Sequence, residues 1–131
     1  MLSPESQLTA ILTPTDNLQV DETGDLLIEG VSASQLIKEY GSPLYVFSEQ
    51  TLRQNFRRIR KAFGAAWPEP VNIMYAIKAN TNLAVRAILS QEGAGGDCFS
   101  EGELFATFEA GADATKIALN GSLKSERSLR I

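Results

Sequence analysis

Residues 71–82 read V-N-I-M-Y-A-I-K-A-N-T-N, and this stretch decides the fold class. Its first seven residues are too continuously apolar for a strand with one face in water, which indicates a parallel strand buried on both faces. Lys78 follows this strand directly and therefore stands at its carboxyl end, where parallel α/β folds build their functional sites. A helical pattern of apolar residues then covers residues 82–91.

The same alternation of strand and helix continues to the end of the sequence. Residues 94–99 predict a second strand and residues 100–111 a helix; residues 116–119 predict a third strand, and Ser122 or Ser125 can open a further helix. Such regular alternation is typical of a parallel α/β sheet. A closed (β/α)₈ barrel takes about 250 residues, whereas this chain has 131. We therefore expect the amino-terminal portion of a TIM-like barrel, truncated within a larger protein.

The sequence suggests three segments. Residues 1–25 are rich in Pro, Ser, Thr and acidic residues, and we expect them to be irregular. Residues 26–48 predict a strand, a helix and a second strand that lead into the barrel, and residues 49–131 form its first part.

Local signals define the lead-in segment more closely. Residues 26–28 predict its first strand, and Ser32 with Gln35 forms a capping box for the helix that Gly41 ends. The apolar residues 44–47 predict its second strand. Ser48 can cap a longer helix that ends at Gly64 and carries five basic residues, which we interpret as a solvated face.

Composition excludes several classes of function. The 16 acidic and 12 basic residues give a net charge of −4, which provides no footprint for nucleic acid or for an anionic membrane. Histidine is absent and cysteine occurs once, so histidine catalysis, internal disulfides and Cys–His metal sites are excluded. No apolar run approaches the roughly 18 residues that span a bilayer. With Lys38 as the first basic residue there is no secretory signal pattern, and we expect a cytoplasmic protein.

Lys78 is the main candidate for chemistry. A lysine at the end of a buried strand is expected to be partly desolvated, which favours the neutral amine that a Schiff base with a carbonyl requires. The alternative is a lysine that ends a strand and extends into water. Asp97 would end the following strand, where its carboxylate could pair with this amine or order the hydrogen bonds of a cofactor.

Other polar residues near the strand ends have simpler interpretations. Ser100 and Glu103 have the spacing of a capping box, which we favour over a catalytic pair. Asn120-Gly121 is a typical turn sequence, although it also falls at the carboxyl end of the third strand. The glycines of residues 93–96 do not form the dinucleotide-binding pattern G-x-G-x-x-G.

Four stretches together resemble the fold-type III pyridoxal-phosphate decarboxylases, with the diaminopimelate decarboxylase group the most similar. They are Y-G-S-P-L-Y-V-F from Tyr40, Y-A-I-K-A-N-T-N from Tyr75, G-A-G-G-D-C-F-S-E-G-E-L from Gly93 and N-G-S-L-K-S from Asn120. The resemblance covers roughly residues 26–131, in the same order and spacing. It implies a (β/α)₈ barrel, with leading strands that join a second, β-rich domain.

The resemblance also implies a function. Lys78 would form the Schiff base with pyridoxal 5′-phosphate, Asp97 would be the cofactor-side aspartate, and the reaction would decarboxylate a diamino acid, as in the conversion of meso-diaminopimelate to L-lysine and CO₂. The complete enzyme would be a homodimer. The family's ring-stacking histidine and phosphate cradle come from later strands, so we expect the 131 residues alone to be inactive. An ornithine- or arginine-type decarboxylase and a non-catalytic homologue or interaction module remain alternatives.

Overall fold

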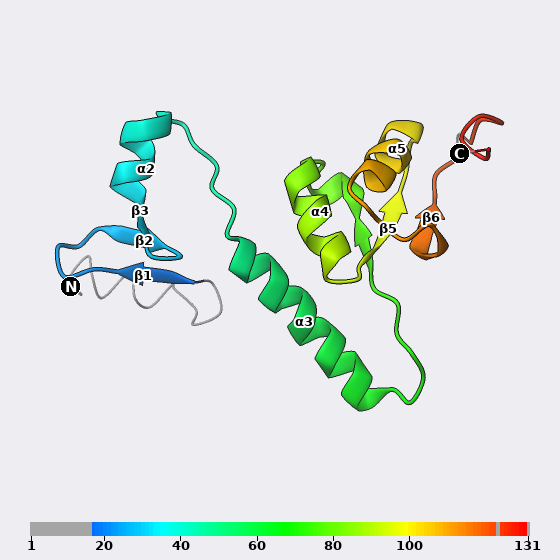
Figure 1. Cartoon of the computed structure of the whole chain (residues 1–131), viewed down its shortest axis with the longest axis horizontal. Helices are drawn as coiled ribbons and strands as arrows, with labels where there is room; N and C mark the ends of the chain where they lie inside the picture. Colours follow the sequence, from blue (N-terminus) through cyan, green and yellow to red (C-terminus); the bar gives the residue numbers. More distant parts are fainter. Residues whose placement is uncertain (1–16, 123, 131) are drawn as a thin grey trace. The chain divides into compact units, whose positions relative to one another are not determined.

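The computed structural model describes residues 17–122 and 124–130, which form two compact units that divide between Gln54 and Asn55 (Figure 1). The expectation for residues 1–16 lies outside the described residues. In chain order the elements are β1 (Leu18–Val20), β2 (Leu26–Ile28), β3 (Val31–Ser32), α2 (Ala33–Tyr40), α3 (Glu49–Ala66), β4 (Met74–Ala76), the 3₁₀ helix η1 (Ile77–Ala79), α4 (Leu83–Gln91), β5 (Gly95–Cys98), α5 (Glu101–Glu109), the 3₁₀ helix η2 (Ala114–Lys116) and β6 (Ile117–Leu119).

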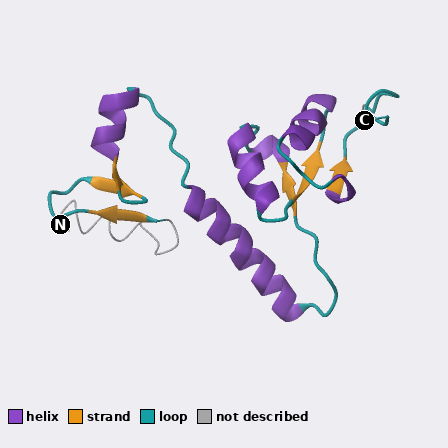
Figure 2. Cartoon of the chain, viewed as in Figure 1, coloured by secondary structure: helices purple, strands orange, loops and turns teal. Residues whose placement is uncertain are grey.

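The first unit contains a small antiparallel sheet in the order β1-β2-β3 (Figure 2). Its β1 lies within residues 1–25, so the expectation of an irregular segment is wrong for residues 18–20. The reason is the turn before β2: the Asp21 carboxylate accepts hydrogen bonds from the backbone N–H groups of Thr23 (2.8 Å) and Asp25 (3.0 Å). This turn returns the chain so that Leu18 lies opposite Ile28.

The helix of the first unit forms as predicted. Ser32 caps α2 by accepting a hydrogen bond from the Gln35 N–H at 3.1 Å, and Gly41, with φ +85°, ends it. Residues 44–47, in contrast, do not form the predicted strand. The side chains of Leu44, Val46 and Phe47 instead help line a cavity of about 510 Å³ beside β2, and no described strand pairs with the backbone of this segment.

The second unit contains a parallel sheet in the order β4-β5-β6 (Figure 2). Sequential parallel strands with a helix between neighbours, α4 between β4 and β5 and α5 between β5 and β6, are the arrangement found in a (β/α)₈ barrel. The predicted α/β class and parallel sheet are therefore confirmed. Asn82 caps α4, and Ser100 caps α5 by accepting a hydrogen bond from the Glu103 N–H at 3.2 Å.

One face of this sheet carries the hydrophobic core. Ile77 and Cys98 come from the sheet side and Leu104 from α5, and all three are buried. Four partly buried side chains complete the cluster: Tyr75, Phe108, Ile117 and Leu119. Residues that alternate with these along the strands therefore lie on the opposite face.

Several element boundaries differ from the sequence predictions. The strand expected over residues 71–77 is regular only at residues 74–76, because only these pair with β5 before the chain turns into η1. Helix α3 continues past Gly64 to Ala66. Residues 126–130 form turns in place of the expected helix, in which the Leu129 N–H donates to the Ser125 carbonyl at 3.2 Å and the Arg130 N–H to the Arg127 carbonyl at 3.1 Å.

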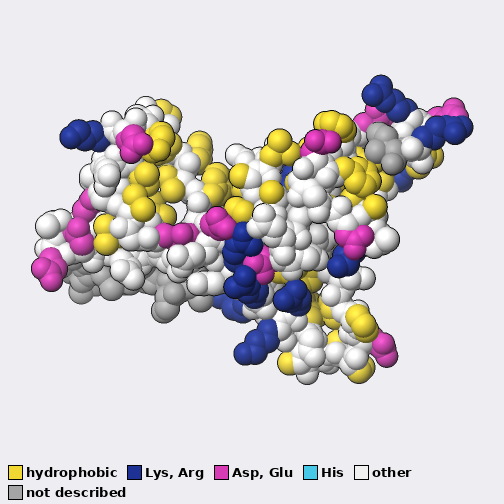
Figure 3. Space-filling view, in the orientation of Figure 1, with side chains coloured by type: hydrophobic (Ala, Val, Ile, Leu, Met, Phe, Trp, Pro, Cys, Tyr) yellow, Lys and Arg dark blue, Asp and Glu magenta, His cyan; other side chains and the backbone are white. Residues whose placement is uncertain are grey.

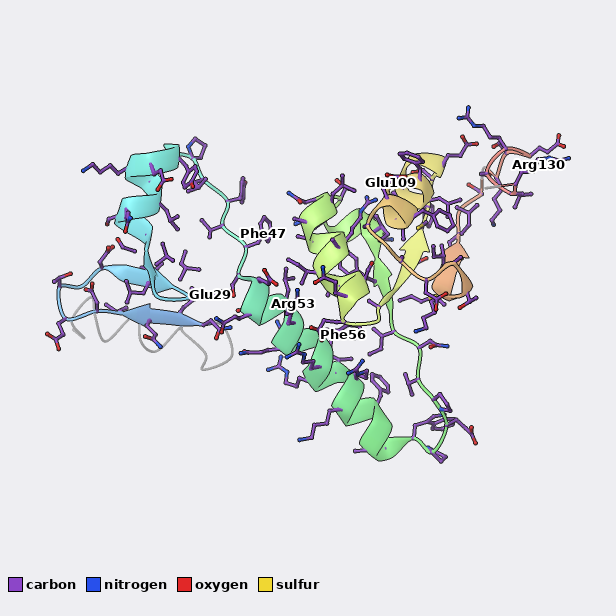
Figure 4. All side chains as sticks on the ribbon, viewed as in Figure 1. Glu29, Phe47, Arg53, Phe56, Glu109 and Arg130 are labelled. Atoms are coloured by element: carbon purple, nitrogen blue, oxygen red, sulfur yellow. The ribbon has the colours of Figure 1, made fainter. Side chains whose placement is uncertain are left out.

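The basic residues of α3 are only partly a solvated face. Figure 3 shows Lys and Arg side chains gathered in this region, and Figure 4 labels Arg53 and Phe56 on the helix. Arg53 pairs with Glu49 on the same helix at 2.6 Å, as a solvated helix face allows. Arg57, however, binds both carboxylate oxygens of Glu92 at the end of α4, and Arg60 donates to the Glu92 carbonyl at 3.0 Å.

No helix among the described residues is long and apolar enough to cross a membrane.

Candidate functional site

Lys78 occupies the position that its sequence context predicted, at the carboxyl end of β4. The strand continues directly into η1, and Lys78 is the middle residue of that single turn. Its side chain is exposed, so the expectation of a partly desolvated lysine is wrong for the described part of the chain. The Lys78 Nζ atom lies over the Phe99 ring, 5.5 Å from its centroid.

Strand register explains why these two side chains meet. Asp97 of β5 is paired with Ala76 of β4 on one side and with Ala118 of β6 on the other. Lys78, Phe99 and Asn120 follow these three paired residues by two positions and lie at a level just beyond the strands, Lys78 within η1. Asp97 itself lies on the sheet face opposite the core, because it alternates along β5 with the buried core residue Cys98.

Asp97 is held by Asn120 of the third strand end. The Asn120 side-chain amide donates a hydrogen bond to Oδ1 of Asp97, and the Asn120 backbone N–H donates to the Cys98 carbonyl at 2.8 Å. The structure thus brings Lys78 and Asp97 to the same edge of the sheet. Among the described residues, no hydrogen bond or ion pair joins them directly, so the predicted pairing of amine and carboxylate is absent from this conformation.

Phe99 is the site residue that the sequence reasoning missed. The available signal was its spacing: it follows Asp97 by two residues and so shares its strand face. Asn120 was noted as a strand-end residue, but its hydrogen bond to Asp97 depends on a side-chain direction that spacing does not specify. Gly121, at φ +98°, reverses the chain after Asn120, and Lys124 Nζ donates to its carbonyl at 3.1 Å.

Ser100 and Glu103 serve the backbone. Besides the cap described above, Glu103 Oε2 accepts a hydrogen bond from the Phe99 N–H at 2.6 Å. This reciprocal arrangement confirms the capping interpretation over a catalytic pair. It also fixes the start of α5 directly after β5, which holds the Phe99 backbone in place.

Cys98 is a core residue on the far side of the same strand. It is fully buried, and its Sγ lies 3.3 Å from the Thr107 hydroxyl oxygen. Burial raises the pKa of the Cys98 thiol, which favours the protonated, unreactive form. Among the described residues, no group of three His, Cys, Asp or Glu side chains is placed to hold a metal ion.

The arrangement offers an accessible primary amine, an aromatic ring beside this amine, and a carboxylate oriented by an amide, all at neighbouring strand ends. A primary amine can bond to the carbonyl carbon of an aldehyde, and a carboxylate can accept hydrogen bonds from cationic nitrogen atoms. These groups suit a carbonyl-containing cofactor.

Comparison with known proteins places this site in a family. Residues 49–131 match the family model described as "Pyridoxal-dependent decarboxylase, pyridoxal binding domain". The chain is 43% identical over 106 residues to a diaminopimelate decarboxylase of Methanothermobacter thermautotrophicus, and this match covers 81% of the chain and 24% of the relative. A diaminopimelate decarboxylase of Synechocystis is 42% identical over 119 residues, which are 85% of this chain and 25% of that protein.

Solved structures give the same result. The crystal structure of diaminopimelate decarboxylase from M. jannaschii matches with a TM-score of 0.83 and 32% identity, over 88% of this chain and 27% of that one. The structure of the same enzyme in complex with L-lysine matches with a TM-score of 0.84. This chain thus spans about a quarter of the length of its relatives. Its fold matches the corresponding part of the TIM-barrel pyridoxal-phosphate enzymes, and it belongs to the pyridoxal-dependent decarboxylase family through its pyridoxal-binding domain, which implies pyridoxal phosphate as the cofactor.

Proposed function

We propose that this chain supplies the cofactor-anchoring part of a decarboxylase that acts on a diamino acid. The observation that carries the proposal is the position of Lys78, with its exposed amine directly after the carboxyl end of β4. These residues fit an aldehyde cofactor because the amine is accessible and the Asp97 carboxylate stands at the end of the adjacent strand.

Lys78 would have two roles in this reaction. Its Nζ would first bond to the cofactor's aldehyde carbon and then give up that position to the amino group of the substrate. When bound, pyridoxal phosphate supplies the electron sink for the electron pair that remains when CO₂ leaves. The released Lys78 amine would then hold a proton at Nζ and return it to the substrate carbon.

Asp97 would act beside the lysine. Its carboxylate, oriented by the Asn120 amide, would accept a hydrogen bond from the cofactor or from the Lys78 ammonium. This hydrogen bond would hold the donor nitrogen, of the cofactor or of Lys78, close to the Asp97 carboxylate. The hydrogen bond from Asn120 fixes one carboxylate oxygen and leaves the other available.

The names of the relatives support diaminopimelate as the substrate, with L-lysine and CO₂ as products. One similar crystal structure is a complex of diaminopimelate decarboxylase with L-lysine, which has the chemistry of this product. We propose in addition that the complete protein is a cytoplasmic homodimer. Because these residues correspond to about a quarter of the relatives, we expect them to release little CO₂ on their own.

A chimeric enzyme tests the proposal. The 106 residues that match M. thermautotrophicus diaminopimelate decarboxylase would replace the corresponding segment of that enzyme, and CO₂ release from diaminopimelate would be measured. We expect an active chimera in which Lys78→Ala lowers kcat by at least about 10³-fold, because covalent anchoring is lost. Lys116→Ala is the matched control. It removes another lysine, at the end of η2, whose Nζ pairs with Asp113 at 3.9 Å, and it should retain activity.

Two outcomes would contradict this function. Unchanged CO₂ release by the Lys78→Ala chimera would exclude the anchoring role. A chimera that folds and binds the cofactor but releases no CO₂, beside an active parent enzyme, would favour the non-catalytic homologue instead.

A further inference from the structure

Phe99 is an exposed aromatic residue at the centre of the candidate site. Its side chain is 54% exposed, although a phenyl ring gains little from contact with water. The ring lies beneath the ammonium group of Lys78, 5.5 Å from ring centroid to Nζ. This separation is within the range of about 6 Å over which a cation is attracted by the face of an aromatic ring.

Gly121 leaves space for this ring. Gly121 has φ +98°, and a Cβ atom at this position would lie 3.1 and 3.2 Å from two carbon atoms of the Phe99 ring and 3.2 Å from the Phe99 carbonyl oxygen. Both the backbone conformation and the close approach therefore require glycine. The ring thus lies close to both the Gly121 backbone and the Lys78 ammonium, and the backbone N–H of Phe99 is held by the Glu103 carboxylate.

We propose that Phe99 is a positioning residue for Lys78. The negative face of its ring attracts the ammonium and holds the lysine side chain over the open face of the sheet, one level beyond Asp97 along the strands. The ring thereby limits the positions of an exposed, flexible side chain before the cofactor arrives. The role of Lys78 rests on the proposed function, whereas its contact with Phe99 is a property of the free chain.

Nuclear magnetic resonance tests the contact directly in the 131-residue chain. Protons on the carbon next to Lys78 Nζ should show an upfield ring-current shift that those of exposed Lys38 lack. Phe99→Leu should abolish this shift, while Phe99→Tyr should retain it. An unchanged backbone amide spectrum for the residues of β5 and β6 would show that the Leu variant is folded.

Each result decides the proposal. Loss of the upfield shift in a folded Phe99→Leu variant, together with its retention in Phe99→Tyr, supports it. Absence of the shift in the unaltered chain, or an undiminished shift in Phe99→Leu, overturns it. None of these readouts requires pyridoxal phosphate. A failure of the contact between Phe99 and Lys78 can therefore be distinguished from a failure of the proposed cofactor role of Lys78.

Discussion

The candidate site depends on three neighbouring strand ends, and its residues differ in how far the sequence predicts them. Lys78 and Asp97 could be placed because each follows an apolar or glycine-rich strand, and strand ends on one sheet edge must be close. The partners of these side chains could not be predicted. Whether Asp97 meets Lys78 or Asn120 depends on rotamers and on the turn into η1, which a two-residue period does not describe.

The thiol of Cys98 provides a prediction about the core of the second unit. It is fully buried, and burial raises its pKa, so very little thiolate is available to react in the folded chain. We expect iodoacetamide at pH 8 to alkylate the folded chain slower, by on the order of 10²-fold or more, than the chain in denaturant. The rate can be followed by mass spectrometry, since this is the chain's single cysteine. Equal rates would show that β5 is not packed as described.

Gly95 provides a prediction about the pairing of β5 with β6. A Cβ atom at Gly95 would lie 2.0 Å from the backbone carbonyl oxygen of Lys116, which leads into β6. Gly95→Ala should therefore lower the free energy of unfolding by about 1–3 kcal/mol, measured by urea denaturation. Gly102→Ala is the matched control: no atom lies within 4 Å of its added Cβ in α5, and a helical alanine should raise stability by about 0.5–1 kcal/mol. A neutral Gly95→Ala would mean that the two strands are not this close.

At the scale of elements, signals carried by neighbouring residues proved reliable. The caps at Ser32 and Ser100 and the capping box of α5 follow from residues three positions apart, so the sequence contains all of their parts. Strand pairing at a distance was harder to predict. Residues 44–47 have the composition of a strand without a described partner, and β1 forms in a segment whose composition suggested none. Strand preference reflects the neighbouring strand as much as the residue itself.

The ion pair between α3 and α4 is another long-range contact that the sequence did not reveal. Arg57 Nε and Nη2 donate to the two Glu92 carboxylate oxygens at 2.7 and 2.6 Å, and the Glu92 side chain is only 7% exposed. Arg57→Ala should lower the free energy of unfolding by about 1–2 kcal/mol, because a buried carboxylate loses a charged donor while the arginine itself is largely solvated. Arg58→Ala, also on an exposed position of α3, should change stability by less than about 0.5 kcal/mol. Equal effects of the two substitutions would contradict a specific role for the pair.

At the scale of the whole molecule, three parallel strands in sequential order agree with the barrel of the relatives. The apolar strand patterns, the helix caps and their spacing were enough to predict the α/β class, because strands that alternate with helices along the sequence form a parallel sheet covered by those helices. The family match adds the identity of the cofactor, because the matched domain is described as a pyridoxal-binding domain. Lys78, Phe99 and Asn120 lie just beyond the paired strand ends. The exposed amine of Lys78 is therefore the group to which we expect the cofactor to attach.

The central claim is that Lys78 is the residue that binds pyridoxal phosphate. The most direct measurement is to incubate the 131-residue chain with pyridoxal phosphate, reduce it with borohydride and locate the pyridoxyl group by peptide mass spectrometry. The account predicts that the label is found on the peptide containing Lys78 in preference to Lys38, Lys116 and Lys124, and that Lys78→Arg removes this preference. Labelling spread evenly over the lysines, or unchanged by Lys78→Arg, would contradict it.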